Sequence, residues 1–193
     1  MKASDVISSG GVIAFRTDTF YGLGADPFNA SAVRRIRELK GREDDNPILL
    51  LISDRPQVER LLVECSHEFN IAAQELWPGP LTIVGKAAAT LPEEITAGTG
   101  TVGVRLPADK SVRDFVRECG GVLTATSANP SGREPARSAQ EAAAYFPTGL
   151  DLIVEGGEVN ATKPSTVLDV SSFPPRVVRE GAIARNVIEQ LFA

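Results

Sequence analysis

The sequence has few of the side chains on which much hydrolase and metal chemistry depends, with one histidine and two cysteines among 193 residues. The single histidine, His67, argues against Ser-His-Asp chemistry and against a histidine-based zinc site. We expect it to be a solvated residue of a helix. Cys65 and Cys119 are too few for a disulfide scaffold and lack the spacing of metal ligands. We therefore expect two free thiols in a protein of the reducing cytoplasm.

The chain also lacks long apolar runs and a large excess of positive charge. No run reaches the length needed to span a bilayer, and the N-terminal segment "MKASDVISSGG" has no continuous apolar core of a secretory signal. We expect no membrane partner. The net charge is −5, whereas proteins that bind duplex nucleic acid are usually basic. This balance argues against a general DNA binder but leaves room for a local basic patch.

Neither standard phosphate-binding loop is present. The sequence contains no G-x-x-x-x-G-K-[ST] motif. The stretch "GTGTVG" at 98–103 fits the G-x-G-x-x-G pattern, but a dinucleotide site needs that pattern between a strand and a helix. Here it leads into a predicted strand, so we interpret it as a turn. A nucleotide, if bound, is held without either loop.

Short β-like runs alternate with helical stretches, which predicts one α/β domain over residues 1–193 with a mixed sheet. The predicted strands are at 10–15, 47–52, 81–86, 101–106, 121–126, 151–156, 165–170 and 176–180. The predicted helices are at 31–41, 54–64, 67–77, 138–146 and 183–192. The run "PILLLI" at 47–52 is continuously apolar rather than alternating, which is typical of a buried strand.

Polar side chains gather where predicted strands begin or end, and the longest such stretch is "TSANPSGREPARS" at 126–138. A connection of this length is unusual in a compact domain. In open α/β sheets ligands bind beyond strand ends, where polar groups face a cavity rather than the core. We therefore interpret the stretch as part of a ligand site. Other candidates of this kind are Thr17, Thr19, Tyr21, Arg105, Ser165, Thr166 and Arg179, with Lys40, Arg42 and Asn46 after the helix at 31–41.

Several polar or aromatic residues near the predicted site also have a purely structural interpretation, which the sequence leaves open. Arg16 fits a salt bridge at the rim as well as a site role, and the charge of Lys40 favours the end of a helix. Arg105 closes an apolar strand just before Pro107. This position favours function, since arginine can bind a carboxylate or a phosphate through two hydrogen bonds. Trp77 is interpreted as a packed anchor rather than a base-stacking platform.

Six motifs, taken together and in order, resemble those of the YrdC-like threonylcarbamoyl-AMP synthases. They are "TDTFYGLGAD", "KGREDDNPILLL", "LWPGPLTIV", "TVGVRLP", "TATSANPSG" and "STVLDV…RVVREGAI". The resemblance extends from about Gly11 to Ile183, which is nearly the whole chain. It implies a twisted, open, mixed sheet flanked by helices, with a concave basic surface that binds ligands. Because the chain ends soon after "REGAI", we expect the short, single-domain form.

The resemblance also implies a reaction. Members of this family use L-threonine, bicarbonate and ATP, with Mg²⁺, to make threonylcarbamoyl-adenylate and pyrophosphate. Mg²⁺ would be bound mainly through the ATP phosphates, with no protein ligand assigned. A separate tRNA-modifying complex then transfers the threonylcarbamoyl group to an adenosine beside the anticodon. No side chain is an evident general base, so we expect positioning and charge neutralisation to carry catalysis.

Roles for individual residues follow from the same resemblance. The residues expected to bind threonine are Thr19, Arg105, Ala125 and Ser165. Those expected to bind ATP are Lys40, Arg42, Asn46, Thr101, Ser127 and Arg179. Lys40 and Arg42 are also expected to stabilise charge on the reacting phosphates.

Two departures from the family pattern keep two other hypotheses open. Members usually carry proline where this chain has Arg16, and many carry histidine where it has Leu51. A paralogue with altered or lost activity is therefore one alternative. An RNA-binding module that uses the same fold for tRNA or double-stranded RNA is the other, supported by an arginine-rich helix face. That face consists of Arg34, Arg35 and Arg37.

Overall fold

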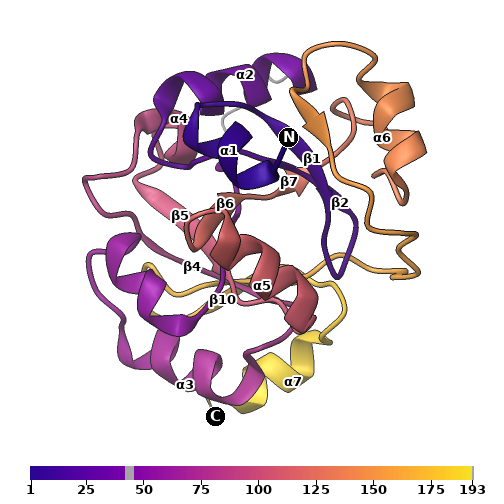
Figure 1. Cartoon of the computed structure of the whole chain (residues 1–193). Coiled ribbons are helices and arrows are strands. Elements are labelled where there is room, and N and C mark those ends of the chain that lie inside the picture. Colours follow the sequence, from indigo (N-terminus) through magenta and orange to yellow (C-terminus); the bar gives the residue numbers. More distant parts are fainter. Residues whose placement is uncertain (42–45, 193) are drawn as a thin grey trace.

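A computed structural model describes residues 1–41 and 46–192, and in this part of the chain the strands form two mixed sheets flanked by helices (Figure 1). The four-stranded sheet consists of β1 (Ile13–Arg16), β2 (Tyr21–Gly24), β7 (Thr126–Ser127) and β8 (Leu152–Ile153), in the order β7-β2-β1-β8. The six-stranded sheet consists of β3 (Leu50–Ile52), β4 (Leu81–Lys86), β5 (Thr101–Arg105), β6 (Val122–Thr124), β9 (Thr166–Asp169) and β10 (Arg176–Arg179), in the order β10-β9-β4-β5-β3-β6.

Helices cover these sheets from several sides. They are α1 (Ala3–Ser8), α2 (Ala30–Lys40), the 3₁₀-helix η1 (Arg55–Arg60), α3 (His67–Leu76), α4 (Glu93–Thr96), α5 (Lys110–Glu118), α6 (Ala139–Tyr145) and α7 (Arg185–Gln190). Helices α2 and α4 pack together at one end of the molecule, and α3 and α7 lie at the other (Figure 1). The longest described helix, α2, has 11 residues, and no helix in this part of the chain could cross a membrane.

The predicted α/β class, with mixed β-structure flanked by helices, is confirmed, and the strands are divided between two sheets. The predicted strand at 121–126 is two strands, because the chain leaves the six-stranded sheet after β6 and enters the four-stranded sheet at β7. At this crossing the Thr124 N–H donates to Ala25 O (3.1 Å), and the Ala125 N–H donates to Leu49 O (2.8 Å). The buried Thr124 hydroxyl donates to Leu23 O (3.1 Å) and accepts from the Ala25 N–H (2.8 Å). This side chain therefore joins the two sheets.

Four elements are missing from the sequence-based prediction, and one has the wrong type. Strand β2 contains two glycines and is buried at all four positions, so it shows neither alternation nor a typical strand composition. Helix α5 has only Val112 and Val116 buried, which is a narrow apolar stripe. Helices α1 and α4 have 6 and 4 residues, too few to show a period. The segment predicted as a helix at 54–64 forms only the 3₁₀-helix η1, over 55–60.

Several local predictions are confirmed. Trp77 is a packed anchor: it meets the Phe69 ring edge-on, and its Nε1–H donates to Leu81 O (2.7 Å). The "GTGTVG" segment is a turn that enters β5, not a strand-to-helix loop. His67 is an exposed residue of α3, and both cysteines are free thiols, with Cys65 exposed and Cys119 buried.

Candidate active site

A cavity of about 820 Å³ lies against one face of the six-stranded sheet. Its floor is made by alternate residues of four neighbouring strands, since successive side chains of a strand point to opposite faces. The floor residues on β4, β5, β9 and β10 are Thr82, Val84, Thr101, Gly103, Arg105, Val167, Asp169, Arg176 and Val178. From Thr101 to Arg105 this floor is roughly 13 Å long, at about 3.3 Å per residue.

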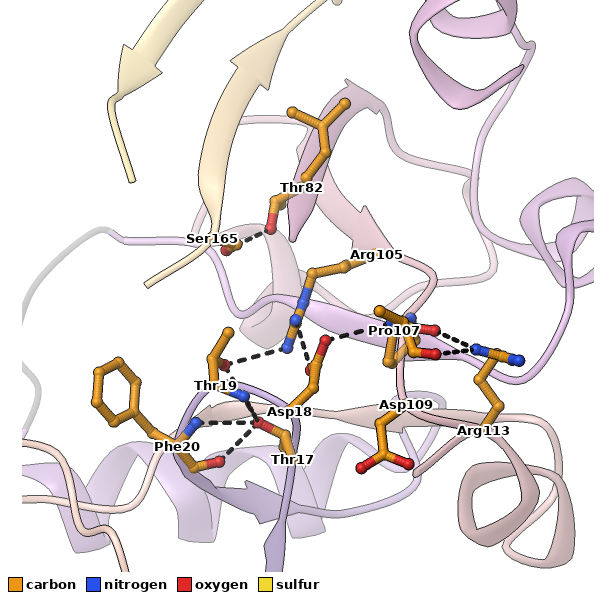
Figure 2. Close-up of polar contacts among 12 residues, drawn as sticks. Thr17, Asp18, Thr19, Phe20, Thr82, Arg105, Pro107, Asp109, Arg113 and Ser165 are labelled. Atoms are coloured by element: carbon orange, nitrogen blue, oxygen red, sulfur yellow. Dashed lines mark hydrogen bonds and ion pairs between the residues drawn. The ribbon is translucent and has the colours of Figure 1, made fainter. Parts of the chain in front are cut away.

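Strand direction brings four polar residues to one edge of this floor. Strand β4 is antiparallel to β5 and parallel to β9, and β9 is antiparallel to β10. The start of β4, the end of β5, the start of β9 and the end of β10 therefore meet at the same edge. These positions hold Thr82, Arg105, Ser165 and Arg179, and all four line the cavity or its floor (Figure 2 shows the first three).

A bulge in β10 adds Arg179 to this edge. Arg176 pairs with Asp169, but further along β10 the register shifts between Val177 and Arg179, so that Arg179 pairs with Val167. An extra residue in one strand re-aims the side chains beside it. As a result Val178 and Arg179, although adjacent in sequence, both line the cavity.

Close packing also shapes the floor at Gly103. A Cβ atom at this position would lie 2.9 Å from the Thr82 Cγ2 atom, closer than carbon atoms normally approach. Glycine therefore leaves room for the Thr82 side chain, whose hydroxyl shares a 2.9 Å hydrogen bond with the Ser165 hydroxyl (Figure 2).

The opposite wall comes from the four-stranded sheet, mainly from the tight turn between β1 and β2. In this turn the Thr17 hydroxyl accepts from the N–H groups of Thr19 and Phe20 (3.2 Å each) and donates to Phe20 O (2.6 Å). A hydroxyl that bonds its own backbone in this way fixes a turn. The turn holds the Thr19 hydroxyl against Arg105, whose Nη2 donates to it at 3.3 Å (Figure 2).

Arg105 is the most deeply buried cation of the site, with 2% of its side chain exposed. Its Nη1 donates to Asp18 Oδ1 at 2.7 Å, and its Nη2 donates to Thr19 Oγ1 at 3.3 Å. Its Nε is buried and has no hydrogen-bond partner among the described residues. Burial lowers the pKa of the guanidinium and the Asp18 charge opposes that shift, so Arg105 stays protonated.

Arg179 brings a second cation close to the first. Its Nη2 donates to the backbone oxygen of Ser165 at 2.9 Å and to the Ser165 hydroxyl at 3.4 Å. Burial lowers the pKa of Arg179, and the positive charge of Arg105 lowers it further. Two guanidinium groups therefore lie near one another at this edge, and the Asp18 carboxylate pairs with that of Arg105 alone. This arrangement favours an anionic ligand.

Among the described residues that line the cavity, positive side chains outnumber negative ones. Those that line the cavity are Arg105, Arg137, Arg176 and Arg179, against Glu134 and Asp169. This confirms the expected concave basic surface. No group of three or more His, Cys, Asp or Glu side chains that could hold a metal occurs among residues 1–41 and 46–192.

A family model named Sua5/YciO/YrdC, with the description "Telomere recombination", matches residues 5–181. The chain belongs to the Sua5/YciO/YrdC family. One similar relative is a threonylcarbamoyl-AMP synthase of Pyrococcus abyssi, 38% identical over 189 residues, which cover 98% of this chain and 56% of the relative. A protein of the same name from Halorhodospira halophila is 37% identical over 167 residues, covering 86% of this chain and 87% of the relative.

Solved structures of family members have the same fold as this chain. The structure of Pyrococcus abyssi Sua5 complexed with L-threonine superposes with a TM-score of 0.93 at 37% identity, covering 99% of this chain and 56% of the Sua5 chain. The chain thus spans about half the length of the Pyrococcus relative and most of the Halorhodospira relative.

The cavity brings together eight of the ten residues that the family resemblance selects. These are Thr19, Asn46, Thr101, Arg105, Ala125, Ser127, Ser165 and Arg179. Arg42 lies outside the described residues. Lys40 is not among the lining residues: its ammonium group is buried and donates to the backbone oxygens of Ser127 (2.6 Å) and Asn129 (2.8 Å). In this structure Lys40 therefore supports the stretch at 126–138, whose first residues line the cavity.

The two departures from the family pattern have different settings. Arg16 makes a 2.8 Å ion pair with Asp109 at the rim and does not line the large cavity. The Arg16 guanidinium, with the Ser111 hydroxyl, lowers the pKa of Asp109 to about 2. Leu51 is fully buried beside Arg105, its register partner on β5, and packs in an apolar cluster with Phe15. It offers no hydrogen bond where many family members have an imidazole.

The arginine-rich face of α2 is occupied by contacts within the chain. Arg34 pairs with Glu94 at 2.6 Å and Arg35 pairs with Asp151 at 2.9 Å. Arg37 donates through Nε to the backbone oxygen of Glu94 at 2.7 Å. Each cation already has a partner, so this face gives the RNA-binding hypothesis little support.

The sequence-based selection missed Asp18 and Thr82. Both stand inside motifs that were recognised, "TDTFYGLGAD" and "LWPGPLTIV". Thr82 is hidden in an apolar strand, and the contact of Asp18 with Arg105 joins residues 87 positions apart. Only the middle position of Asp18 between two site hydroxyls could have drawn attention to it.

Proposed function

We propose that the protein is a threonylcarbamoyl-AMP synthase, which converts L-threonine, bicarbonate and ATP into threonylcarbamoyl-adenylate, pyrophosphate and water. The relatives of that name, at 37–38% identity over most of this chain, support this function. The observation that carries the proposal is the pair of guanidinium groups at one end of the cavity floor, with hydroxyls around them. This end suits a carboxylate and a hydroxyl of an amino acid.

The amino acid and the nucleotide would lie side by side along the floor. Threonine would bind between Arg105, Thr19, Ser165 and Ala125. At the far end, Thr101 and Asn46 would contact the nucleotide, with Ser127 and Arg179 nearer the reacting phosphate. A floor of about 13 Å, the span of the five residues of β5, has room for an amino acid joined to an adenylate.

The chemistry demands neutralisation of charge more than proton transfer. The deprotonated amine of threonine attacks bicarbonate and gives a carbamate, with loss of water. A carbamate oxygen then attacks the α-phosphate of ATP, and pyrophosphate leaves with the electron pair of the broken P–O bond. Both reactants are anions, so cations must offset their repulsion and hold them in line. We assign this task to Arg105 and Arg179, the two guanidinium groups at this end of the cavity.

Lys40 and Arg42 are proposed to stabilise charge on the ATP phosphates. For Lys40, the support is that its ammonium group lies directly behind Ser127, a residue of the cavity wall. Mg²⁺ would enter with the nucleotide, bound through phosphate and water oxygens. The described residues offer no cluster of ligands for it, so no step is assigned to the ion.

Pyrophosphate release from purified protein tests this function. We expect release from ATP that requires both L-threonine and bicarbonate, with threonylcarbamoyl-adenylate as the matching product by mass spectrometry. Release that does not depend on threonine, or an adenylate that lacks the carboxyl carbon of bicarbonate, would contradict the proposal. The product would then be consumed by a tRNA-modifying complex that transfers the threonylcarbamoyl group.

Discrimination among amino acids gives a sharper test of the proposed threonine end. A pocket that hydrogen-bonds a hydroxyl rejects an analogue without it far more strongly than one that lacks a methyl group. We expect serine to be a poor but detectable substrate, down roughly tenfold to two-hundredfold in kcat/KM, and valine to be nearly inactive. The three amino acids are compared at saturating ATP and bicarbonate. If valine equals or exceeds serine, these hydroxyls do not form the pocket.

A further inference from the structure

Asp18 occupies an unexpected place for an acidic residue, because its carboxylate lies beside a site proposed to bind another carboxylate. It stands between Thr17 and Thr19 in the turn that follows β1. Its side chain is 12% exposed, and its Oδ1 accepts from Arg105 Nη1 at 2.7 Å (Figure 2). A negative charge here would repel a carboxylate substrate, so its presence calls for a reason.

The second oxygen of Asp18 holds the segment that follows β5. Asp18 Oδ2 accepts from the Ala108 N–H at 3.3 Å. The same segment is held from its other side by Arg113, whose Nη1 donates to the backbone oxygens of Pro107 (2.6 Å) and Ala108 (2.8 Å) (Figure 2). One carboxylate thus links three parts of the protein: the turn after β1, the Arg105 side chain and the segment after β5.

The hydrogen bonds of Arg105 show what this link achieves. Asp18 takes one hydrogen of Nη1, and Thr19 accepts from Nη2 at 3.3 Å. A guanidinium has five N–H donors in a rigid plane, so a fixed partner on one side determines where the remaining donors point. Without Asp18, only the longer bond to Thr19 would hold the Arg105 guanidinium in this orientation, next to the like charge of Arg179.

We propose that Asp18 is a positioning residue: it orients the guanidinium of Arg105 so that its remaining N–H groups face the carboxylate of the amino acid substrate. This inference rests on the proposed function. Arg179 supplies the second positive charge that lets a substrate carboxylate bind despite the charge of Asp18.

The test compares Asp18→Ala, which removes both oxygens, with Asp18→Asn, which keeps an oxygen that can accept from Arg105. We expect KM for threonine to rise roughly tenfold to a hundredfold in Asp18→Ala, the size of one lost charge-assisted hydrogen bond, and less in Asp18→Asn. KM for ATP should stay within about twofold, as expected for a residue that acts only through Arg105. The control is Asp109→Asn, which loses the ion pair to Arg16 in the segment after β5 but contacts neither Arg105 nor the cavity.

Crystal structures of the wild type and of Asp18→Ala give a readout that does not need the reaction. We expect the Arg105 guanidinium to leave its wild-type position while the β5 backbone stays in place. A guanidinium that stays in its wild-type position would overturn the proposal. So would equal rises in KM for threonine and ATP, or a lower melting temperature with both KM values unchanged. Failure of the proposed function is distinguishable, because the wild type itself would then release no pyrophosphate, and the crystal structures alone would decide the role of Asp18.

Discussion

Replacement of Arg105 with alanine is expected to have the largest effect of any single substitution in the site. Threonine affinity should fall by about tenfold to a hundredfold, because a charge-assisted hydrogen bond contributes roughly 1.5–3 kcal/mol. The protein should also lose stability. The change leaves the carboxylate of Asp18, 12% exposed, without its cation, and breaking a buried ion pair from one side costs about 3–5 kcal/mol. Calorimetric titration with threonine and chemical denaturation measure the two effects.

Arg105→Lys separates these two effects. The lysine keeps a positive charge for Asp18, so most of the stability should return, but it lacks the planar fork that binds a carboxylate through two hydrogen bonds. We expect its threonine affinity to remain well below that of the wild type. If both variants bind threonine as the wild type does, Arg105 does not bind the amino acid carboxylate.

Replacement of Gly181 with alanine is expected to damage the fold and the site together. The added Cβ would clash with the backbone oxygens of Pro164 and Ser165, and these backbone atoms cannot rotate away. The Gly181 N–H also donates to the Thr166 hydroxyl at 3.0 Å. Overpacking of this kind costs typically about 1–3 kcal/mol, or a fall of roughly 2–12 °C in melting temperature for a domain of this size. Because Ser165 would move, kcat/KM for threonine should fall as well.

Gly85→Ala is the matched control. Its added Cβ would meet only the end of the Leu62 side chain, at 3.0–3.3 Å, and that side chain can adjust. We expect a change in melting temperature of no more than about 2–4 °C, or roughly 1 kcal/mol, and unchanged kinetics. A Gly181→Ala protein as stable and active as this control would show that the backbone near Ser165 is not as rigid as its contacts imply.

The fold was predictable where one segment's own pattern decides its structure. The floor strands β4, β5 and β9 and the amphipathic helix α2 follow from apolar runs and capping residues. The split of 121–126 into β6 and β7 was not predictable from the sequence. It depends on hydrogen bonds between Thr124 or Ala125 and residues about 75 to 100 positions away. A local pattern contains no signal of a change of partner.

That most of the selected residues lie around one cavity was predictable from the motifs, but the partners of the charged side chains were not. Residues such as Thr19, Arg105 and Ser165 stand beside strand ends, and their positions in the sequence are enough to select them. The sequence could not tell that Arg16 pairs with Asp109 or that Lys40 bonds the backbone oxygens of Ser127 and Asn129. Both depend on which groups the fold places within hydrogen-bonding distance of a cation, and that is set by tertiary packing.

Because the chain passes from one sheet into the other at Ala125, neither sheet is a separable module. Thr19 and Ser127 belong to the four-stranded side and Arg105 and Ser165 to the six-stranded side, so the cavity is enclosed by both sheets. Exchange of a contiguous segment between relatives would therefore combine cavity-lining residues of one protein with those of another. We therefore expect the specificity of the site for its amino acid or nucleotide to change through single substitutions in the whole chain. Exchange of one sheet between relatives is not expected to transfer it.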